Sequence, residues 1–220
     1  MTVKFVHIHI PKTAGTSVTS CMRKMFGNNR VAHFGRRERT QLFRELTRKQ
    51  LSKYTCIGGH VMYPQFVKKV GVGPLYFSIV RDPLDRYVSF YSDVSQRESH
   101  PLHPVASQLS PSDFLLEVIS EEYMYSQYRY LSRDGSFESA IKLVRSGKIT
   151  VQSLENHDKL LGYIAKVAGK ASPVLPRKNK SKPVSLIDRS ALEPIVRDHF
   201  QNDFEIYNFV NSVENDLPVI

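Results

Sequence analysis

A short run of basic, small and hydroxyl residues near the N-terminus has the composition of an anion-binding loop. It reads Lys12-Thr13-Ala14-Gly15-Thr16-Ser17 and follows the apolar, β-prone stretch 5–10. Gly15 lets the backbone turn and approach a ligand closely, and the N–H groups that open a following helix attract negative charge. Lys12 adds a point charge, and Thr16 and Ser17 add hydroxyl donors. The loop therefore predicts a phosphate-type site, with an ordinary strand-to-helix turn as the alternative; the Gly-Lys-Ser/Thr order of a Walker A loop is absent.

A second candidate unit begins with Arg81-Asp82-Pro83, directly after the apolar run Leu75–Val80. Open α/β sheets bind ligands at the carboxyl ends of their strands, where Arg81 falls. Pro83 suits the first turn of a helix, and Asp82 suits its cap. Ser89 lies about two turns along that helix, on a side that could face a ligand held by Arg81. The alternative is that Arg81 pairs with an acid and Ser89 is a packed helix serine.

A histidine lies between these two units, in Gly59-His60-Val61. A neutral imidazole can take a proton near physiological pH, so His60 is a candidate general base, with a structural histidine as the alternative. His7 and His9 share one face of the first strand and are interpreted as structural or hydrogen-bonded. No spacing of ligands predicts a metal site.

The elements that must position these residues alternate along the chain. Strands are predicted over 5–10, 54–61, 75–80 and 148–152, and loops over 100–111 and 171–183. Helices are predicted over 18–26, 39–51, 84–94, 112–120, 122–131, 136–145, 156–168 and 188–213, the last one broken before Asp203. This alternation predicts a three-layer α/β fold with a central parallel sheet of about five strands, organised as a single domain over residues 1–220.

Composition narrows the possible partners. The 220 residues include 31 Lys+Arg and 21 Asp+Glu, for a formal net charge of +10, and 41% are hydrophobic. This is the composition of a globular protein with an anionic partner, and no apolar run is long enough for a membrane span. Ten Lys or Arg fall within 23–53 against two glutamates, yet no zinc-finger, helix-turn-helix or RNA-recognition signature accompanies them. Two cysteines, Cys21 and Cys56, are expected to be reduced core thiols in a cytoplasmic protein.

Taken together, the two units resemble those of the sulfotransferases that use 3′-phosphoadenosine-5′-phosphosulfate. The phosphosulfate loop of that family is similar to residues 9–17, and its 3′-phosphate site is similar to Val80-Arg81-Asp82-Pro83 followed by Arg86 and Ser89. The resemblance is greatest to the glycan-modifying branch that includes the heparan sulfate 2-O-sulfotransferases. In that branch a Gly-His-Val segment between the two motifs supplies the base. The stretches 127–131 and 202–207 also resemble family helices.

The resemblance implies a role for each candidate residue. Lys12 would neutralise charge on the leaving phosphate, and His60 would take the acceptor proton. Donor-binding residues would be Lys12, Thr13, Ala14, Gly15, Thr16, Ser17, Arg81 and Ser89, joined by Lys180 and Ser181 from the basic loop 177–182. Arg129 would contact an acidic acceptor. No metal is required, and the product nucleotide is adenosine 3′,5′-bisphosphate.

The chain departs from the animal glycan sulfotransferases in showing no membrane anchor and few cysteines. That departure predicts a cytoplasmic, bacterial-like enzyme that acts on a saccharide or a sugar-containing metabolite, with neither nucleic acid nor membrane as partner. Two other readings stay open. One is a phosphate-loop nucleotide or small-molecule kinase, which would need ATP and a metal. The other is a non-enzymatic basic protein that binds acidic glycan or nucleic acid.

Overall fold

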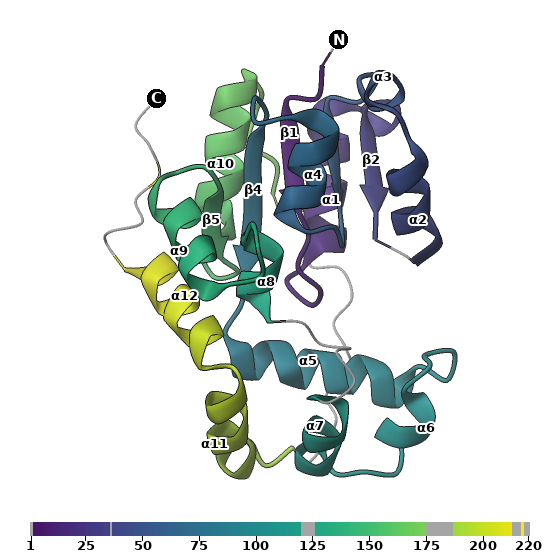
Figure 1. Cartoon of the computed structure of the whole chain (residues 1–220), viewed down its shortest axis with the longest axis vertical. Helices are drawn as coiled ribbons and strands as arrows, with labels where there is room; N and C mark the ends of the chain where they lie inside the picture. The colour runs from purple at the N-terminus through teal and green to yellow at the C-terminus, as the bar shows by residue number, and fades with distance from the viewer. Residues whose placement is uncertain (1, 36, 120–125, 175–186, 213–216, 218–220) are drawn as a thin grey trace.

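The computed structural model describes residues 2–35, 37–119, 126–174, 187–212 and 217. Within them five parallel strands form one sheet in the order β2-β3-β1-β4-β5 (Figure 1). The strands are β1 (Phe5–Ile8), β2 (Val31–Phe34), β3 (Cys56–Gly59), β4 (Leu75–Val80) and β5 (Thr150–Ser153). The predicted parallel α/β sheet of about five strands is confirmed.

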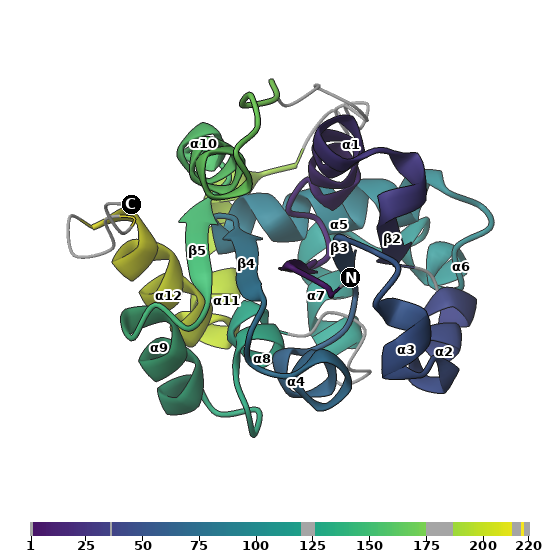
Figure 2. The same ribbon diagram turned by 90° about the horizontal axis from the view of Figure 1, so that it is seen from above.

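Helices cover both faces of the sheet (Figure 2), which explains why every residue of β1 and all but the first of β4 are buried. On one face, α1 (Gly15–Phe26) and α10 (His157–Ala168) pack Val18 and Leu160 near Phe77 of β4. On the other face lie α4 (Tyr63–Val70), α9 (Phe137–Arg145) and α12 (Gln201–Asn211). Side chains from these helices bury the opposite side of β1 and β4.

A third group of helices lies below the carboxyl edge of the sheet (Figure 1). Its members are α5 (Pro83–Gln96), α6 (His103–Ala106), α7 (Pro111–Ile119) and α11 (Arg189–His199), which share a separate apolar core. As predicted, α5 begins at Pro83, and Asp82 caps it by accepting a hydrogen bond from the Asp85 amide at 2.9 Å. This helix forms a floor beneath the strand ends where the candidate residues lie.

Several predicted boundaries were wrong for local reasons. The predicted helix 39–51 is two helices, α2 (Arg37–Glu45) and α3 (Arg48–Leu51), because a capping box between Thr47 and Gln50 starts a new one. By contrast, the helix predicted over 188–213 is broken before Asp203 as expected, because α11 (Arg189–His199) ends and α12 begins at Gln201. The predicted loop 100–111 contains the four-residue α6, and the edge strand β2 and helix α4 were not predicted. Of the helix predicted over 122–131, the part within the described residues is α8 (Gln127–Leu131). A short 3-10 helix, η1 (Asn28–Arg30), precedes β2.

Two further findings concern the cysteines and the length of the helices. Cys21 and Cys56 are both buried in the core as thiols, as expected. Among the helices in the described part of the chain, none has the length and apolar character needed to cross a bilayer.

Candidate active site

The loop that follows β1, residues 11–17, contains two strained residues. Lys12 and Ala14 have φ values of 69° and 61°, in the left-handed region that non-glycine residues rarely adopt. Such strain persists where surrounding contacts enforce it and is concentrated at functional sites. Here the Thr13 hydroxyl donates to the Ile10 carbonyl at 2.8 Å, and an Arg81 guanidinium nitrogen lies 3.4 Å from the Lys12 carbonyl.

Within the described residues, this conformation leaves backbone amides unpaired at the N-terminus of α1. The amides of Ser17 and Val18 donate back to the Ala14 carbonyl, at 2.9 and 3.1 Å. The amides of Gly15 and Thr16 have no backbone acceptor within the described residues, and Thr16 is exposed. Two free amides and nearby hydroxyls at a helix N-terminus can hold an anionic group.

Gly15 has a different role from the one expected. Its φ is not in the positive range, so Lys12 and Ala14, rather than the glycine, make the turn. A Cβ on Gly15 would lie 1.8 Å from Nε2 of His9. Glycine is therefore required because the His9 ring occupies the space where a side chain would be.

Lys12 points to the helical floor. Its Nζ lies 3.4 Å from Oδ2 of Asp93 on α5, and Arg97 binds the same oxygen at 3.2 Å. Burial lowers the pKa of Lys12, while the charge of Asp93 and its hydrogen bond oppose that shift. Ser89 lies one helical turn before Asp93, so both residues are on the face of α5 that meets the loop.

The backbone of Arg81 is fixed by a residue that the sequence did not single out. Gln127, the first residue of α8, accepts from the Arg81 amide at 3.0 Å and donates to the Arg81 carbonyl at 2.8 Å. The side chain of Gln127 is fully buried. This pairing leaves the Arg81 guanidinium at the strand end, next to the loop.

His60 follows β3 at the same edge of the sheet. Its ring centroid lies 4.4 Å from that of His9, which in turn covers Gly15. The imidazole is largely buried, and its Nε2 has no hydrogen-bond partner among the described residues. Burial lowers the pKa of His60 to about 4, so the ring is neutral and able to accept a proton at pH 7.

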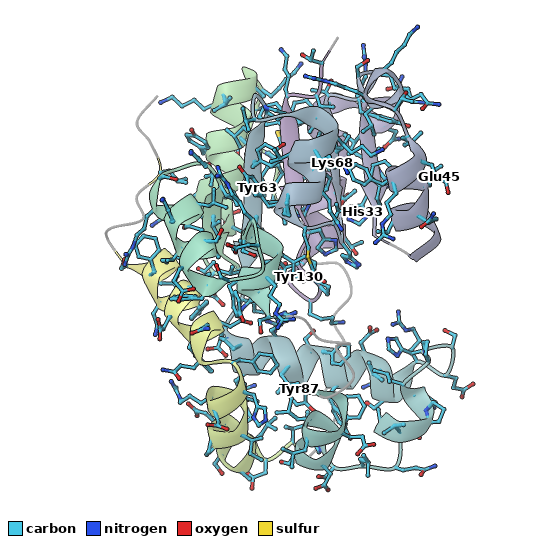
Figure 3. All side chains as sticks on the ribbon, viewed as in Figure 1. His33, Glu45, Tyr63, Lys68, Tyr87 and Tyr130 are labelled. Carbon is cyan, nitrogen blue, oxygen red and sulfur yellow. The ribbon has the colours of Figure 1, made fainter. Side chains whose placement is uncertain are left out.

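Two further histidines complete a cluster around His60. His9 Nδ1 lies 2.9 Å from Nε2 of His33 on β2. The half-buried His33 side chain is labelled in Figure 3. His7 stacks between His9 and Phe77, and burial lowers its pKa to about 3. The hydrogen-bonded role expected of His9 is confirmed. His33 was missed because β2 was not predicted.

Of the remaining candidates, one lies on α8 and two lie outside the described residues. Arg129 is exposed on α8, two residues after Gln127. Lys180 and Ser181 lie outside the described residues. Within the described ranges, no group of three or more His, Cys, Asp or Glu has an arrangement that could hold a metal ion.

The carboxyl edge of the sheet thus carries His60 after β3, the loop after β1 and Arg81 after β4, and these three strands are neighbours. Residues 2–129, which contain all three, match the family model described as the sulfotransferase family. The chain belongs to the sulfotransferase family. The predicted membership is confirmed, and the matched region also contains Ser89 and Arg129.

Curated relatives point to the glycan branch of the sulfotransferases. Heparan sulfate 2-O-sulfotransferase 1 of Gallus gallus is 30% identical over 101 residues, which cover 40% of this chain and 28% of the relative. The proteins of the same name from Mus musculus and Homo sapiens are each 29% identical over 98 residues, covering 39% of this chain and 28% of the relative. The match therefore spans less than a third of these relatives' length.

Proposed function

We propose that this sulfotransferase moves a sulfuryl group from 3′-phosphoadenosine-5′-phosphosulfate to a hydroxyl of a carbohydrate-containing acceptor. One observation carries the proposal: the phosphosulfate-type loop and Arg81 lie in direct contact, Arg81 on the Lys12 carbonyl at 3.4 Å. An anion site at a helix N-terminus next to a second cationic site suits a nucleotide with phosphate groups at both the 3′ and the 5′ position of its ribose.

The chain fits such a donor through several of its own groups. The amides of Gly15 and Thr16 and the hydroxyls of Thr16 and Ser17 would hold the 5′-phosphate, together with the Thr13 and Ala14 backbone. Arg81 and Ser89 would hold the 3′-phosphate. The donor supplies an activated sulfuryl group, whose transfer builds negative charge on the phosphate oxygen that leaves. Lys12, which lies in the same loop and is partly desolvated, would neutralise that charge.

His60 acts as the general base in this proposal. The free imidazole is a weak base because burial lowers its pKa to about 4. An anionic donor bound nearby favours the protonated ring and raises that pKa, which strengthens the base when the donor is present. With the donor bound, His60 would take the proton of the acceptor hydroxyl as its oxygen bonds to sulfur and the bond from sulfur to the phosphate oxygen breaks.

The acceptor is proposed to be a saccharide because the matched relatives are named for heparan sulfate. Arg129 is the candidate contact for an acidic group on it, and Lys180 and Ser181 are candidate contacts for the donor. We further propose that residues 1–220 act as one sulfotransferase domain in the cytoplasm, where buried thiols such as Cys21 and Cys56 stay reduced.

A transfer assay tests the proposal. Purified protein is incubated with the sulfur-labelled donor and a heparan sulfate oligosaccharide that lacks 2-O-sulfate, with and without a metal chelator. We expect acceptor-dependent label transfer and release of adenosine 3′,5′-bisphosphate. Phosphoryl transfer from ATP that the chelator abolishes, without any sulfuryl transfer, would contradict the proposal and favour a kinase. Binding of the oligosaccharide without binding of either nucleotide would favour a basic binding protein.

A further inference from the structure

A charged pair lies inside the molecule, where the proposed chemistry does not use it. Arg86 of α5 and Asp203 of α12 are 1% and 0% exposed, and their side chains lie 3.5 Å apart. Burying two charges costs more free energy than packing apolar side chains of the same volume, so such a pair is weak evidence for stability alone. Its other contacts show what it holds.

Arg86 reaches the phosphosulfate-type loop. Its Nε donates to the Pro11 carbonyl at 3.1 Å, immediately before Lys12. Three consecutive loop carbonyls thus each accept a side-chain hydrogen bond: Ile10 from Thr13, Pro11 from Arg86 and Lys12 from Arg81. These bonds enclose the strained residue Lys12, whose φ is 69°.

Asp203 reaches the other half of the site. Its carboxylate accepts from the backbone amides of Gln127 at 2.8 Å and Tyr128 at 3.2 Å. Gln127 in turn makes both hydrogen bonds to the Arg81 backbone. One carboxylate on α12 is therefore connected to the Lys12 loop through Arg86 and to Arg81 through Gln127.

We propose that Arg86 and Asp203 are positioning residues for sulfuryl transfer. They fix the Lys12 loop and the Arg81 strand end relative to each other, so that the groups at the two ends of the donor keep one spacing. The proposal rests on the proposed function. It predicts that the pair matters to turnover even where the fold tolerates its loss, because a displacement of about 1 Å can reduce a rate by roughly 100-fold.

The test compares Arg86→Met, Asp203→Asn and the double variant with wild type. Each single variant leaves one buried charge unpaired, and we expect its Tm to fall by roughly 10 °C. The neutral double variant should recover at least half of that loss. Its kcat should still be reduced by roughly 10- to 100-fold at 20 °C, with acceptor KM within about twofold of wild type.

Leu192→Ala is the matched control for stability. Leu192 is fully buried on α11 in the helical core. Its replacement by alanine leaves a cavity and is expected to lower Tm to a similar extent. Leu192 makes none of the hydrogen bonds that connect Arg86 and Asp203 to the Lys12 loop and to Arg81. The kcat of Leu192→Ala at 20 °C should therefore stay within about twofold of wild type.

Arg86→Lys provides a second arm if the neutral variants do not fold. Lysine keeps the charge beside Asp203 but lacks the planar fork that serves both Asp203 and Pro11. We expect a folded protein with kcat reduced about tenfold or more. Full kcat in the double variant or in Arg86→Lys would overturn the positioning role. A wild-type protein that neither binds adenosine 3′,5′-bisphosphate nor transfers sulfate would instead overturn the proposed function.

Discussion

At the scale of single residues, the site depends on how burial changes the charge of its side chains. Burial keeps His60 neutral at pH 7 and lowers the pKa of Lys12, while Asp93 supports the charged form of that lysine. Both residues are candidates that their motifs and the family resemblance select from the sequence. The sequence did not reveal Asp93, Gln127 or Asp203, because a helix pattern alone cannot show which polar side chain becomes buried against which partner.

Replacing His60 by alanine tests the base directly. We expect His60→Ala to reduce turnover by about 100-fold or more, because general-base assistance is lost. Its affinity for adenosine 3′,5′-bisphosphate should stay within about twofold, since the phosphate contacts lie on other residues. Parallel kinetics and calorimetric titration provide the two numbers. Retained turnover in this variant would remove His60 from the mechanism.

Asp93 provides a test of Lys12 through the pH dependence of the rate. Lys12 must be protonated to neutralise the leaving oxygen, and Asp93 raises its pKa against the effect of burial. Asp93→Asn should therefore lower that pKa and move the high-pH limb of the kcat profile down by about half a pH unit or more.

Arg97→Gln is the control with the opposite sign. Arg97 lowers the pKa of Lys12 by repulsion, so its removal should move the same limb upward. A shift in the same direction for both variants would mean that this limb does not report Lys12.

At the scale of elements, predictability followed how strongly each element is marked in the sequence. β4 was predicted with its observed bounds because it is a continuous apolar run that ends at Arg81-Asp82-Pro83. β2 was missed because it has only four residues, two of them half-buried at the sheet edge. That omission hid His33, whose place beside His9 and His60 depends on the pairing of β2 with β3.

The junction between β1 and α1 makes its own prediction. Gly15→Ala would place a Cβ 1.8 Å from the His9 ring, so the ring or the loop must move. We expect donor affinity and turnover each to fall by roughly tenfold or more. His9→Ala combined with Gly15→Ala removes the obstructing ring and should recover donor affinity above that of Gly15→Ala alone. Equal affinities in the single and double variants would show that the clash is not the cause.

At the scale of the whole molecule, the net charge of +10 divides into parts. Lys12 and Arg81 are the cations of the proposed donor site, Arg86 pairs inside the molecule with Asp203, and most of the basic residues within 23–53 lie on α1, α2 and α3. The general α/β architecture was predictable because alternating elements admit few arrangements. The helical floor was not, since it depends on contacts between α5 and α11, which are far apart in sequence.

The buried histidines predict how global stability changes with pH. The pKa values of His7 and His60 are lowered to about 3 and about 4, and that of His9 is also lowered. Below pH 6.5 these histidines bind protons in the unfolded chain but stay neutral in the folded protein. The free energy of unfolding therefore falls with acidification, by about 1.4 kcal/mol per pH unit for each such histidine. Asp203 has the opposite effect, because its pKa is raised to about 6 and the folded protein binds its proton more readily than the unfolded chain does. It is one group against three histidines.

Urea unfolding at pH 7.5 and 5.5 measures this balance. We expect lower stability at pH 5.5, and a smaller difference in a His7→Phe variant, which keeps the ring stacked on Phe77 but removes one titrating group. Stability that is equal or higher at pH 5.5 would contradict the burial of these histidines.

The most direct test of the central claim is nucleotide binding that depends on both phosphates. The Tm of wild type and of Arg81→Ala is measured with adenosine 3′,5′-bisphosphate, 5′-AMP or ATP at equal concentration. Only the bisphosphate can contact both the loop, through its 5′-phosphate, and Arg81, through its 3′-phosphate. The account predicts a Tm increase for the bisphosphate well above that for 5′-AMP or ATP, and loss of this preference in Arg81→Ala. An equal shift by all three nucleotides in wild type, or an unchanged preference in Arg81→Ala, would contradict it.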